Sequence, residues 1–192
     1  MKKASRFIFL FALPSIFALL GTSCANRNLH PEKTKALDSL ALLLDSANAT
    51  LAKSDSVLIR NHINHVFIIV EQVQSNVIDK KDTISRGAAE ILRTLNGIRW
   101  QLETYSGRKP VLMSVMKQSA IQLRNLRHDI ANNRIPADSV NVYYNLETKK
   151  ADELLETAQQ SFKLIETEMP FYDMMAPKAD SLIGRLNRHQ GI

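Results

Sequence analysis

Hydrophobic residues recur at alternating steps of three and four along most of the chain after residue 32. That spacing places them on one face of an α-helix, where they can be buried against neighbouring helices. The segment 32–53 shows it first, with Leu37, Leu40, Leu44 and Leu51 in one stripe. The strict alternation of a β-strand is not found, so the pattern predicts an all-α protein.

A boundary between two helices is predicted at residues 54–56. Ser54, Asp55 and Ser56 can cap helix ends with their side chains. The apolar stripe restarts out of phase at Ile59 and continues to Val77. A single long helix over 33–79 is the alternative interpretation, because no glycine or proline enforces the break.

Two further helices are predicted between residues 84 and 133. The first has an unbroken seven-residue repeat over 84–105, with Asp82 or Thr83 as its N-cap. Ser106 and Gly107 are typical of a helix C-terminus, and Pro110 suits the first turn of a new helix. This second helix is expected to end near Asn132 and Asn133.

The last part of the chain predicts one long helix and one short one. Pro136 and Asp138 open the long helix, and Pro170 ends or kinks it. A turn over 171–176 and a short helix over 177–188 follow. The whole pattern predicts an antiparallel bundle of about five long helices plus a short C-terminal helix, forming a single domain over 33–192.

The first 24 residues have the organisation of a secretory signal peptide. Lys2, Lys3 and Arg6 precede an uncharged apolar run over 7–20, and small residues lead to Cys24. The run of 14 residues is shorter than the ~20 that a helix needs to span a bilayer. Cleavage after residue 23 is therefore expected.

Cys24 is the only cysteine, and it closes this segment. Here the sequence resembles bacterial lipoproteins, although Leu20 lies four residues before the cysteine and Gly21 fills its usual place, as the looser sites of Bacteroidetes allow. The resemblance implies a lipid on Cys24, including a palmitate-type acyl chain, with 24–32 as a short tether. A soluble secreted protein and an uncleaved inner-membrane anchor are the alternatives.

A second resemblance covers most of the mature chain through scattered residues. They look like the layout of a group of small helical lipoproteins of Bacteroidetes with no assigned activity. The resemblance implies an exported helical lipoprotein of the cell envelope and no particular chemistry. Its residues are Gln122, Leu123, Leu126, Asp129, Ile130, Ile135, Tyr144, Glu147, Tyr172, Pro177, Ala179 and Ile183.

Charge and compartment limit the partners. Three of the 25 basic residues and none of the 19 acidic ones lie before Cys24, so the mature net charge is +3 rather than +6. That excess is too small to indicate nucleic acid. In Bacteroidetes lipoproteins an acidic run after the cysteine resembles a signal for export to the cell surface. No such run follows Cys24, so the resemblance implies the periplasmic face of the outer membrane. Since a lipidated Cys24 cannot form a disulfide, packing must hold the domain together.

Candidate chemistry is sparse, and each candidate has a simpler explanation. His62 and His65 lie one turn apart and are weak metal ligands, but they are more simply surface residues. The carboxylates of Glu147, Asp152, Glu153 and Glu156 are more simply a solvated helix face than an acid/base pair. The aromatic residues are expected in the core or at its edge; they are Trp100, Tyr105, Tyr143 and Tyr144.

A basic surface is the remaining candidate. Lys117, Arg124, Arg127 and Arg134 fall on one side of a predicted helix, and it could dock an anionic partner of the envelope. The simpler interpretation is a solvated face partly neutralised by the acidic helix that begins at Pro136.

No cofactor and no enzymatic activity are predicted. The favoured function is a non-enzymatic, membrane-anchored module that binds or scaffolds an envelope component. A ligand-binding or enzymatic bundle with a site between its helices, and an exported chaperone-like protein, are the alternatives.

Overall fold

The computed structural model describes residues 28–80 and 84–188, and all regular structure in these ranges is α-helical. The four helices are α1 (Pro31–Lys53), α2 (Ser56–Lys80), α3 (Arg86–Ala131) and α4 (Ala137–Arg188). The all-α prediction is confirmed. The predicted count of five long helices plus a short one is wrong, because α3 and α4 each combine two predicted helices.

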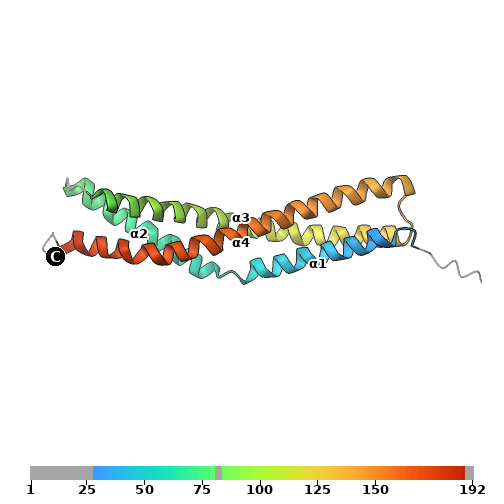
Figure 1. Ribbon diagram of the computed structural model, residues 1–192, viewed down its shortest axis with the longest axis horizontal. Helices are drawn as coiled ribbons and strands as arrows, with labels where there is room; N and C mark the ends of the chain where they lie inside the picture. Colours follow the sequence, from blue (N-terminus) through green and yellow to red (C-terminus); the bar gives the residue numbers. More distant parts are fainter. Residues whose placement is uncertain (1–27, 81–83, 189–192) are drawn as a thin grey trace, which may run out of the picture.

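The helices form an elongated rod in which α3 and α4 pack against each other, against α1 over one half and against α2 over the other (Figure 1). The helices α1 and α2 follow one another along one side, while α3 and α4 each run the whole length. The helix α3 is antiparallel to the other three. With 52 residues at 1.5 Å each, α4 is about 78 Å long.

The break between α1 and α2 is confirmed at the predicted place. Asp55 caps α2, since its Oδ1 accepts hydrogen bonds from the backbone N–H groups of Val57 and Leu58, each at 2.9 Å. Ser54 ends α1, and its N–H donates to the Leu51 carbonyl at 3.2 Å. Capping side chains therefore set this boundary without glycine or proline.

The helix α3 continues through Ser106, Gly107 and Pro110, where a boundary was predicted. Its buried positions keep the three-and-four spacing on both sides, from Leu102 and Tyr105 to Leu112 and Met116. Pro110 is exposed, so water can reach the carbonyl that lacks a helical donor. Interruption by proline costs ~3 kcal/mol, which is about what one or two buried leucines contribute.

The same reasoning explains why α4 is continuous through Pro170 and Pro177. Both prolines are exposed, while Tyr172, Ala176 and Ala179 between and beyond them are buried. A kink on the solvent side leaves the buried stripe in register. The predicted turn over 171–176 is therefore wrong, and the predicted short helix is the end of α4.

The C-terminal end of α3 agrees with the sequence prediction, whereas its N-cap does not. The helix α3 stops at Ala131, and Asn133 takes a positive φ of 52°, which asparagine tolerates. Ser85 is the N-cap of α3 and accepts from the Ala88 N–H at 3.2 Å, so the N-cap predicted at Asp82 or Thr83 is wrong. The signal peptide and Cys24 lie outside the described residues.

Candidate functional site

The two histidines predicted as weak metal ligands meet α4 in the half of the rod that contains α2. The His62 ring stacks on Tyr172, with ring centroids 3.7 Å apart and planes at 12°. His65 Nδ1 lies 2.6 Å from the Tyr172 hydroxyl oxygen, and its Nε2 lies 3.1 Å from Asp180 Oδ1. One tyrosine therefore bridges both histidines, which is a contact that the sequence alone did not predict.

Burial shifts the pKa values of two residues in this cluster, His62 and Tyr172. It lowers the pKa of His62 and outweighs Asp173, which raises that pKa; His65 lowers it further. Burial, Asp180 and Asp173 together raise the pKa of Tyr172. A protonated Tyr172 can donate to His65 Nδ1, which leaves the Nε2–H of His65 to donate to Asp180. His62 Nδ1 is buried without a hydrogen-bond partner.

This arrangement uses the imidazoles for packing and hydrogen bonding between helices. Both ring nitrogens of His65 have protein partners. Within the described ranges, no group of three or more histidine, cysteine, aspartate or glutamate residues is placed to hold a metal. The cluster thus connects α2 to α4 through ring stacking and hydrogen bonds.

A second polar cluster covers the junction between α1 and α2. Lys109 Nζ donates to the Ser54 carbonyl at 3.0 Å, to Ser54 Oγ at 2.8 Å and to Ser56 Oγ at 2.9 Å. The Tyr105 hydroxyl lies 2.7 Å from Ser54 Oγ. Lys109 lies between Tyr105 and Leu112 at the three-and-four spacing of the buried stripe of α3. This spacing in the sequence already indicated that Lys109 faces the other helices.

Three residues of the predicted basic surface lie along the C-terminal half of α3, and Arg134 follows the end of this helix. Arg124 pairs with Asp45, and Arg127 Nε lies 3.1 Å from Asp38 Oδ2. Arg134 lies 3.8 Å from Asp129 within its own segment, and Lys117 is exposed. The acidic residues that offset these arginines come from α1 and α3, so the expected neutralisation by the helix after Pro136 is wrong.

The predicted positions of the aromatic residues are only partly correct. Tyr105 is buried, and Tyr144 is half-buried with Lys33 Nζ 5.6 Å from its ring centroid. Tyr143 and Trp100 are exposed, which contradicts their expected place in or beside the core. Trp100 is 61% exposed. Trp100 lies on a face of α3, and Tyr143 on a face of α4, that the other described helices leave exposed.

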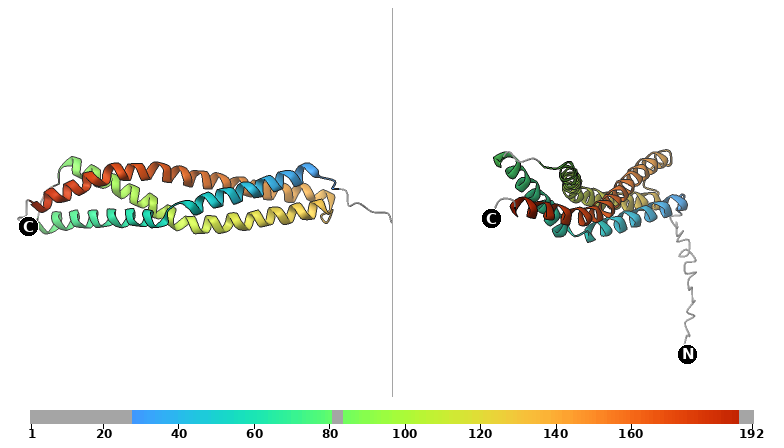
Figure 2. Two further views of the ribbon diagram at one scale, coloured as in Figure 1. Left: turned by 90° about the horizontal axis from the view of Figure 1, so that it is seen from below. Right: turned by 60° about the vertical axis from the view of Figure 1, so that its left-hand side comes forward.

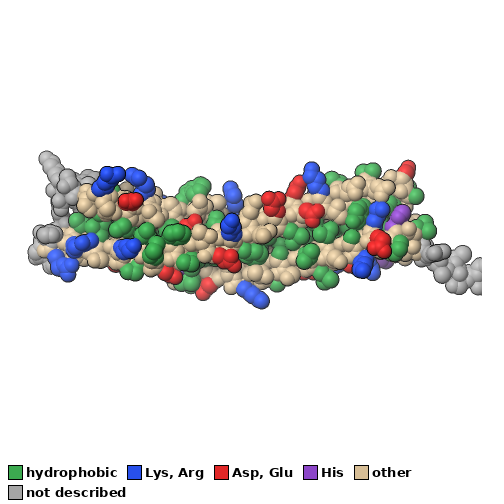
Figure 3. All heavy atoms as spheres, in the orientation of Figure 1, with side chains coloured by type: hydrophobic (Ala, Val, Ile, Leu, Met, Phe, Trp, Pro, Cys, Tyr) green, Lys and Arg blue, Asp and Glu red, His purple; other side chains and the backbone are tan. Residues whose placement is uncertain are grey.

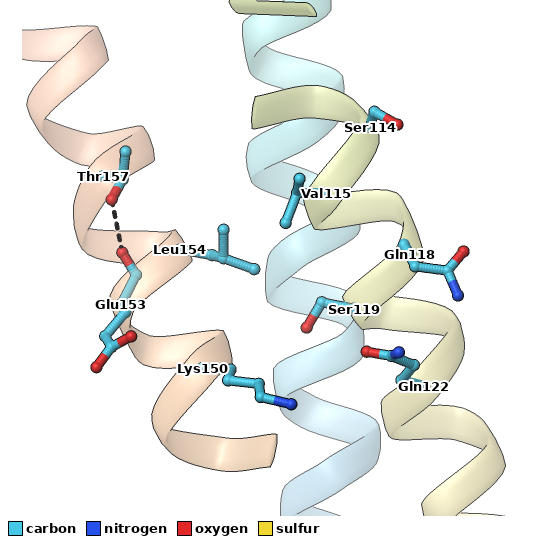
Figure 4. Close-up of a pocket in the computed structure, with 9 residues that line it drawn as sticks. All are labelled: Ser114, Val115, Gln118, Ser119, Gln122, Lys150, Glu153, Leu154 and Thr157. Atoms are coloured by element: carbon cyan, nitrogen blue, oxygen red, sulfur yellow. Dashed lines mark hydrogen bonds between the residues drawn. The ribbon is translucent and has the colours of Figure 1, made fainter. Parts of the chain in front are cut away.

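A groove between α3 and α4, in the half of the rod that contains α1, holds a cavity of about 700 Å³. Figure 4 shows Leu154 and Lys150 directed from α4 toward α3, with Val115 and Ser119 opposite and α1 behind. The Ser119 hydroxyl is buried without a hydrogen-bond partner. The lining comprises Ser114, Val115, Gln118, Ser119, Gln122, Lys150, Glu153, Leu154 and Thr157.

The carboxylates near this groove do not form an acid/base pair. Glu153 is the single carboxylate in the lining. Glu147 accepts from Lys150 at 2.9 Å through Oε1, and its Oε2 is buried without a partner. Asp152 and Glu156 are exposed. The groove can therefore supply hydrogen bonds and apolar contact to a ligand.

None of the described helices is long and apolar enough to span a membrane. Comparison with protein families, with curated proteins and with solved structures gives no match. The function is therefore inferred from the residues and the geometry of this chain.

Proposed function

We propose that the chain is a lipid-anchored, rod-shaped helical module of the bacterial cell envelope that binds or scaffolds another envelope component. The observation that carries the proposal is the position of the first helix. The helix α1 begins at Pro31, seven residues after Cys24, and its start lies at one end of the rod (Figure 1). A lipid on Cys24 would therefore hold the rod by its end.

The tether is short compared with the rod. Seven residues span at most about 25 Å, whereas α4 alone is about 78 Å long. The connection between α3 and α4 lies beside the start of α1, and the C-terminal end of α4 lies at the opposite end with the end of α2 (Figure 2). A lipid on Cys24 would therefore keep the half containing α1 next to the membrane and let the half containing α2 extend away from it.

The surface supports a binding role. Large hydrophobic side chains are exposed on all four helices, among them Leu43 on α1, Phe67 on α2, Val111 on α3 and Leu146 on α4. The space-filling view shows hydrophobic side chains gathered along the middle of one face, between charged residues (Figure 3). Exposed apolar surface bordered by charge is typical of sites that contact partners.

A ligand-binding bundle is the second candidate, and the groove between α3 and α4 favours it. Its cavity of about 700 Å³ contains the buried, unpartnered Ser119 hydroxyl. Buried polar groups are normally satisfied or used by a ligand. The predicted surface for an anionic partner contributes less to the proposal, because Asp38, Asp45 and Asp129 offset three of its four cations.

The anchor can be tested in cells with a clickable palmitate analogue. The wild-type protein should incorporate the label and remain with the membrane fraction. The variant Cys24→Ser should lose the label and leave the membrane, whereas the neighbouring change Asn26→Ser should behave as wild type. Labelled Cys24→Ser protein would refute the anchor.

The binding role is tested separately by crosslinking in cells, followed by purification from the envelope. A reproducible partner whose yield decreases when the exposed hydrophobic residues Phe67 and Ile68 are changed to serine supports it. Recovery of the same partners with a control lipoprotein contradicts it.

A further inference from the structure

Two aromatic rings flank a small cavity between α3 and α4 in the half of the rod that contains α2. Trp100 on α3 is the only tryptophan in the chain and is 61% exposed; Phe171 on α4 is 46% exposed. Both line a cavity of about 370 Å³. An indole that is mostly in water has a ring face available for another flat, partly apolar group.

The floor of this cavity includes bare backbone. Gly97 lines it, one turn of α3 before Trp100. Glycine inside a helix is less stable than alanine. A Cβ added at Gly97 would meet nothing within 4 Å, so contacts within the protein do not require glycine here. What the glycine does provide is open space in the lining, one turn of α3 from Trp100.

Polar groups complete the lining. Thr94, Gln101 and Glu168 supply a hydroxyl, an amide and a carboxylate. The Thr94 hydroxyl donates to the Glu90 carbonyl at 3.0 Å, which leaves its oxygen free to accept. Two aromatic residues, a glycine and hydrogen-bonding groups therefore line one open cavity. A purely apolar ligand would leave the amide and the carboxylate unpaired, which is unfavourable.

We propose that this cavity binds a pyranose unit of a saccharide chain. A pyranose has apolar C–H faces that can stack on Trp100 and Phe171, and hydroxyls around its edge that can bond to Gln101, Thr94 and Glu168. The missing side chain at Gly97 lets the sugar ring approach α3. The inference rests on the proposed binding role and names the chemical class of the envelope component, but it does not depend on the lipid.

Trp100 makes the test direct, because the indole emission of the whole protein comes from this one residue. The lipidated protein is purified in a zwitterionic detergent without a sugar headgroup and titrated with maltotriose, cellotriose or triacetylchitotriose. Binding of at least one of them with a Kd of about 1 mM or lower should produce a saturable change in emission. No saturable change with any of the three up to about 10 mM overturns the proposal.

Two glycines on the same helix provide a matched pair of variants. Gly97→Leu fills the cavity and should weaken binding by about tenfold or more. Gly107→Leu is the control: a Cβ there also meets open space, and Gly107 is not part of the lining. It should leave the Kd unchanged within about twofold. Equal affinity in both variants contradicts the assignment.

Three further measurements keep the outcome clear. Circular dichroism checks that both leucine variants remain folded, and Gly97→Ala replaces Gly97→Leu if the latter does not. Trp100→Ala, measured by calorimetry, should also lose about tenfold in affinity. A hydrophobic dye that binds at the cavity and is not displaced by the sugars would overturn the proposal. Palmitate labelling of Cys24 stays intact whichever result is found, so failure here is distinct from failure of the anchor.

Discussion

One half of the rod contains α1 and the other contains α2, while α3 and α4 run through both. The helices α1 and α2 have nearly equal lengths but pack differently. The helix α1 has 23 residues and α2 has 25, yet α1 packs more extensively against both α3 and α4. Leu37, Leu44 and Leu51 on α1 are fully buried. The buried positions on α2 carry the β-branched side chains of Ile59, Val66 and Val73, and the two valines are smaller than leucine.

Each half also contains a cavity and a buried polar atom without a hydrogen-bond partner. In the α1 half these are the groove of about 700 Å³ and the Ser119 hydroxyl. A cavity of about 330 Å³ lies between α2 and α3, where Val70, Val73 and Leu92 line it. His62 is buried there with an unpartnered nitrogen. The comparison teaches that the half containing α1 has the more extensive leucine core, whereas the half containing α2 carries a histidine–tyrosine–aspartate cluster between α2 and α4.

The largest expected effect comes from truncating the core in each half. Leu44→Ala should lower the free energy of unfolding by about 4 kcal/mol, and Ile69→Ala by about 2 kcal/mol, because a looser surrounding relaxes around the deleted atoms. Both residues are at most 1% exposed in the wild type, so burial does not explain the difference. Urea denaturation measures both, and equal losses would contradict the comparison.

Removing a proline from the half containing α2 should have the opposite sign. Pro170→Ala restores a backbone donor inside α4, and the residue is exposed, so no core contact is lost. The free energy of unfolding should rise by about 2 kcal/mol. Lys163→Ala, also exposed on α4, is the control and should change stability by less than about 0.5 kcal/mol. A decrease for Pro170→Ala would mean that the kink itself is needed for packing.

The sequence predicted the parts of the fold that depend on local chemistry. The boundary at Asp55 and the end of α3 near Asn132 follow from capping side chains and were predicted correctly. The continuity of α3 through Pro110 and of α4 through Pro170 was not, because it depends on burial against other helices, which outweighs the local preference of proline. The spacing from Tyr105 through Lys109 to Leu112 contained this information.

The candidate sites were less predictable for the same reason. The distance along the chain between His65 and Asp180, or between Arg127 and Asp38, is too long for periodicity to indicate a contact. The exposure of Trp100 also depends on which side of α3 faces neighbouring helices. The lipid on Cys24 remains a prediction.

The junction between the halves should be sensitive to the loss of one charge. Lys109→Met keeps the length of the side chain but removes the donor to Ser54 and Ser56. Stability should fall by about 1–2 kcal/mol, because the Ser54 carbonyl is left without that donor. Thermal unfolding compared with the exposed Arg108→Met measures this. A stabilised Lys109→Met protein would show that the polar junction is unfavourable.

The polar cluster of the half containing α2 predicts a pH dependence. The pKa of folded His62 is lowered from 6.5, so the unfolded chain binds a proton more readily, and stability should fall as the pH decreases below about 6.5. His62→Phe keeps a ring against Tyr172 and removes the titrating group. It should flatten the decrease between pH 7.5 and 5 and add up to about 1 kcal/mol at low pH. An unchanged pH profile would contradict the role of His62.

The smallest effect is expected from the ion pairs of the half next to the tether. Arg127→Ala removes the pair with Asp38, whose side chain is 46% exposed. An exposed pair of this kind contributes less than about 0.5 kcal/mol. Chemical denaturation at low and high salt measures the loss. A loss of more than about 1 kcal/mol would show that charge, as well as the leucine core, stabilises this half.

The end-on anchor is tested most directly by the distance of each end of the rod from a membrane. A cysteine for labelling is introduced at Ala137 or at Ser181, both exposed on α4 and about 66 Å apart along the helix. Energy transfer from the label to an acceptor dye in the bilayer is then measured with the lipidated protein. The account predicts strong transfer for Ala137→Cys and little for Ser181→Cys. Equal transfer from the two positions, or none from either, would contradict it.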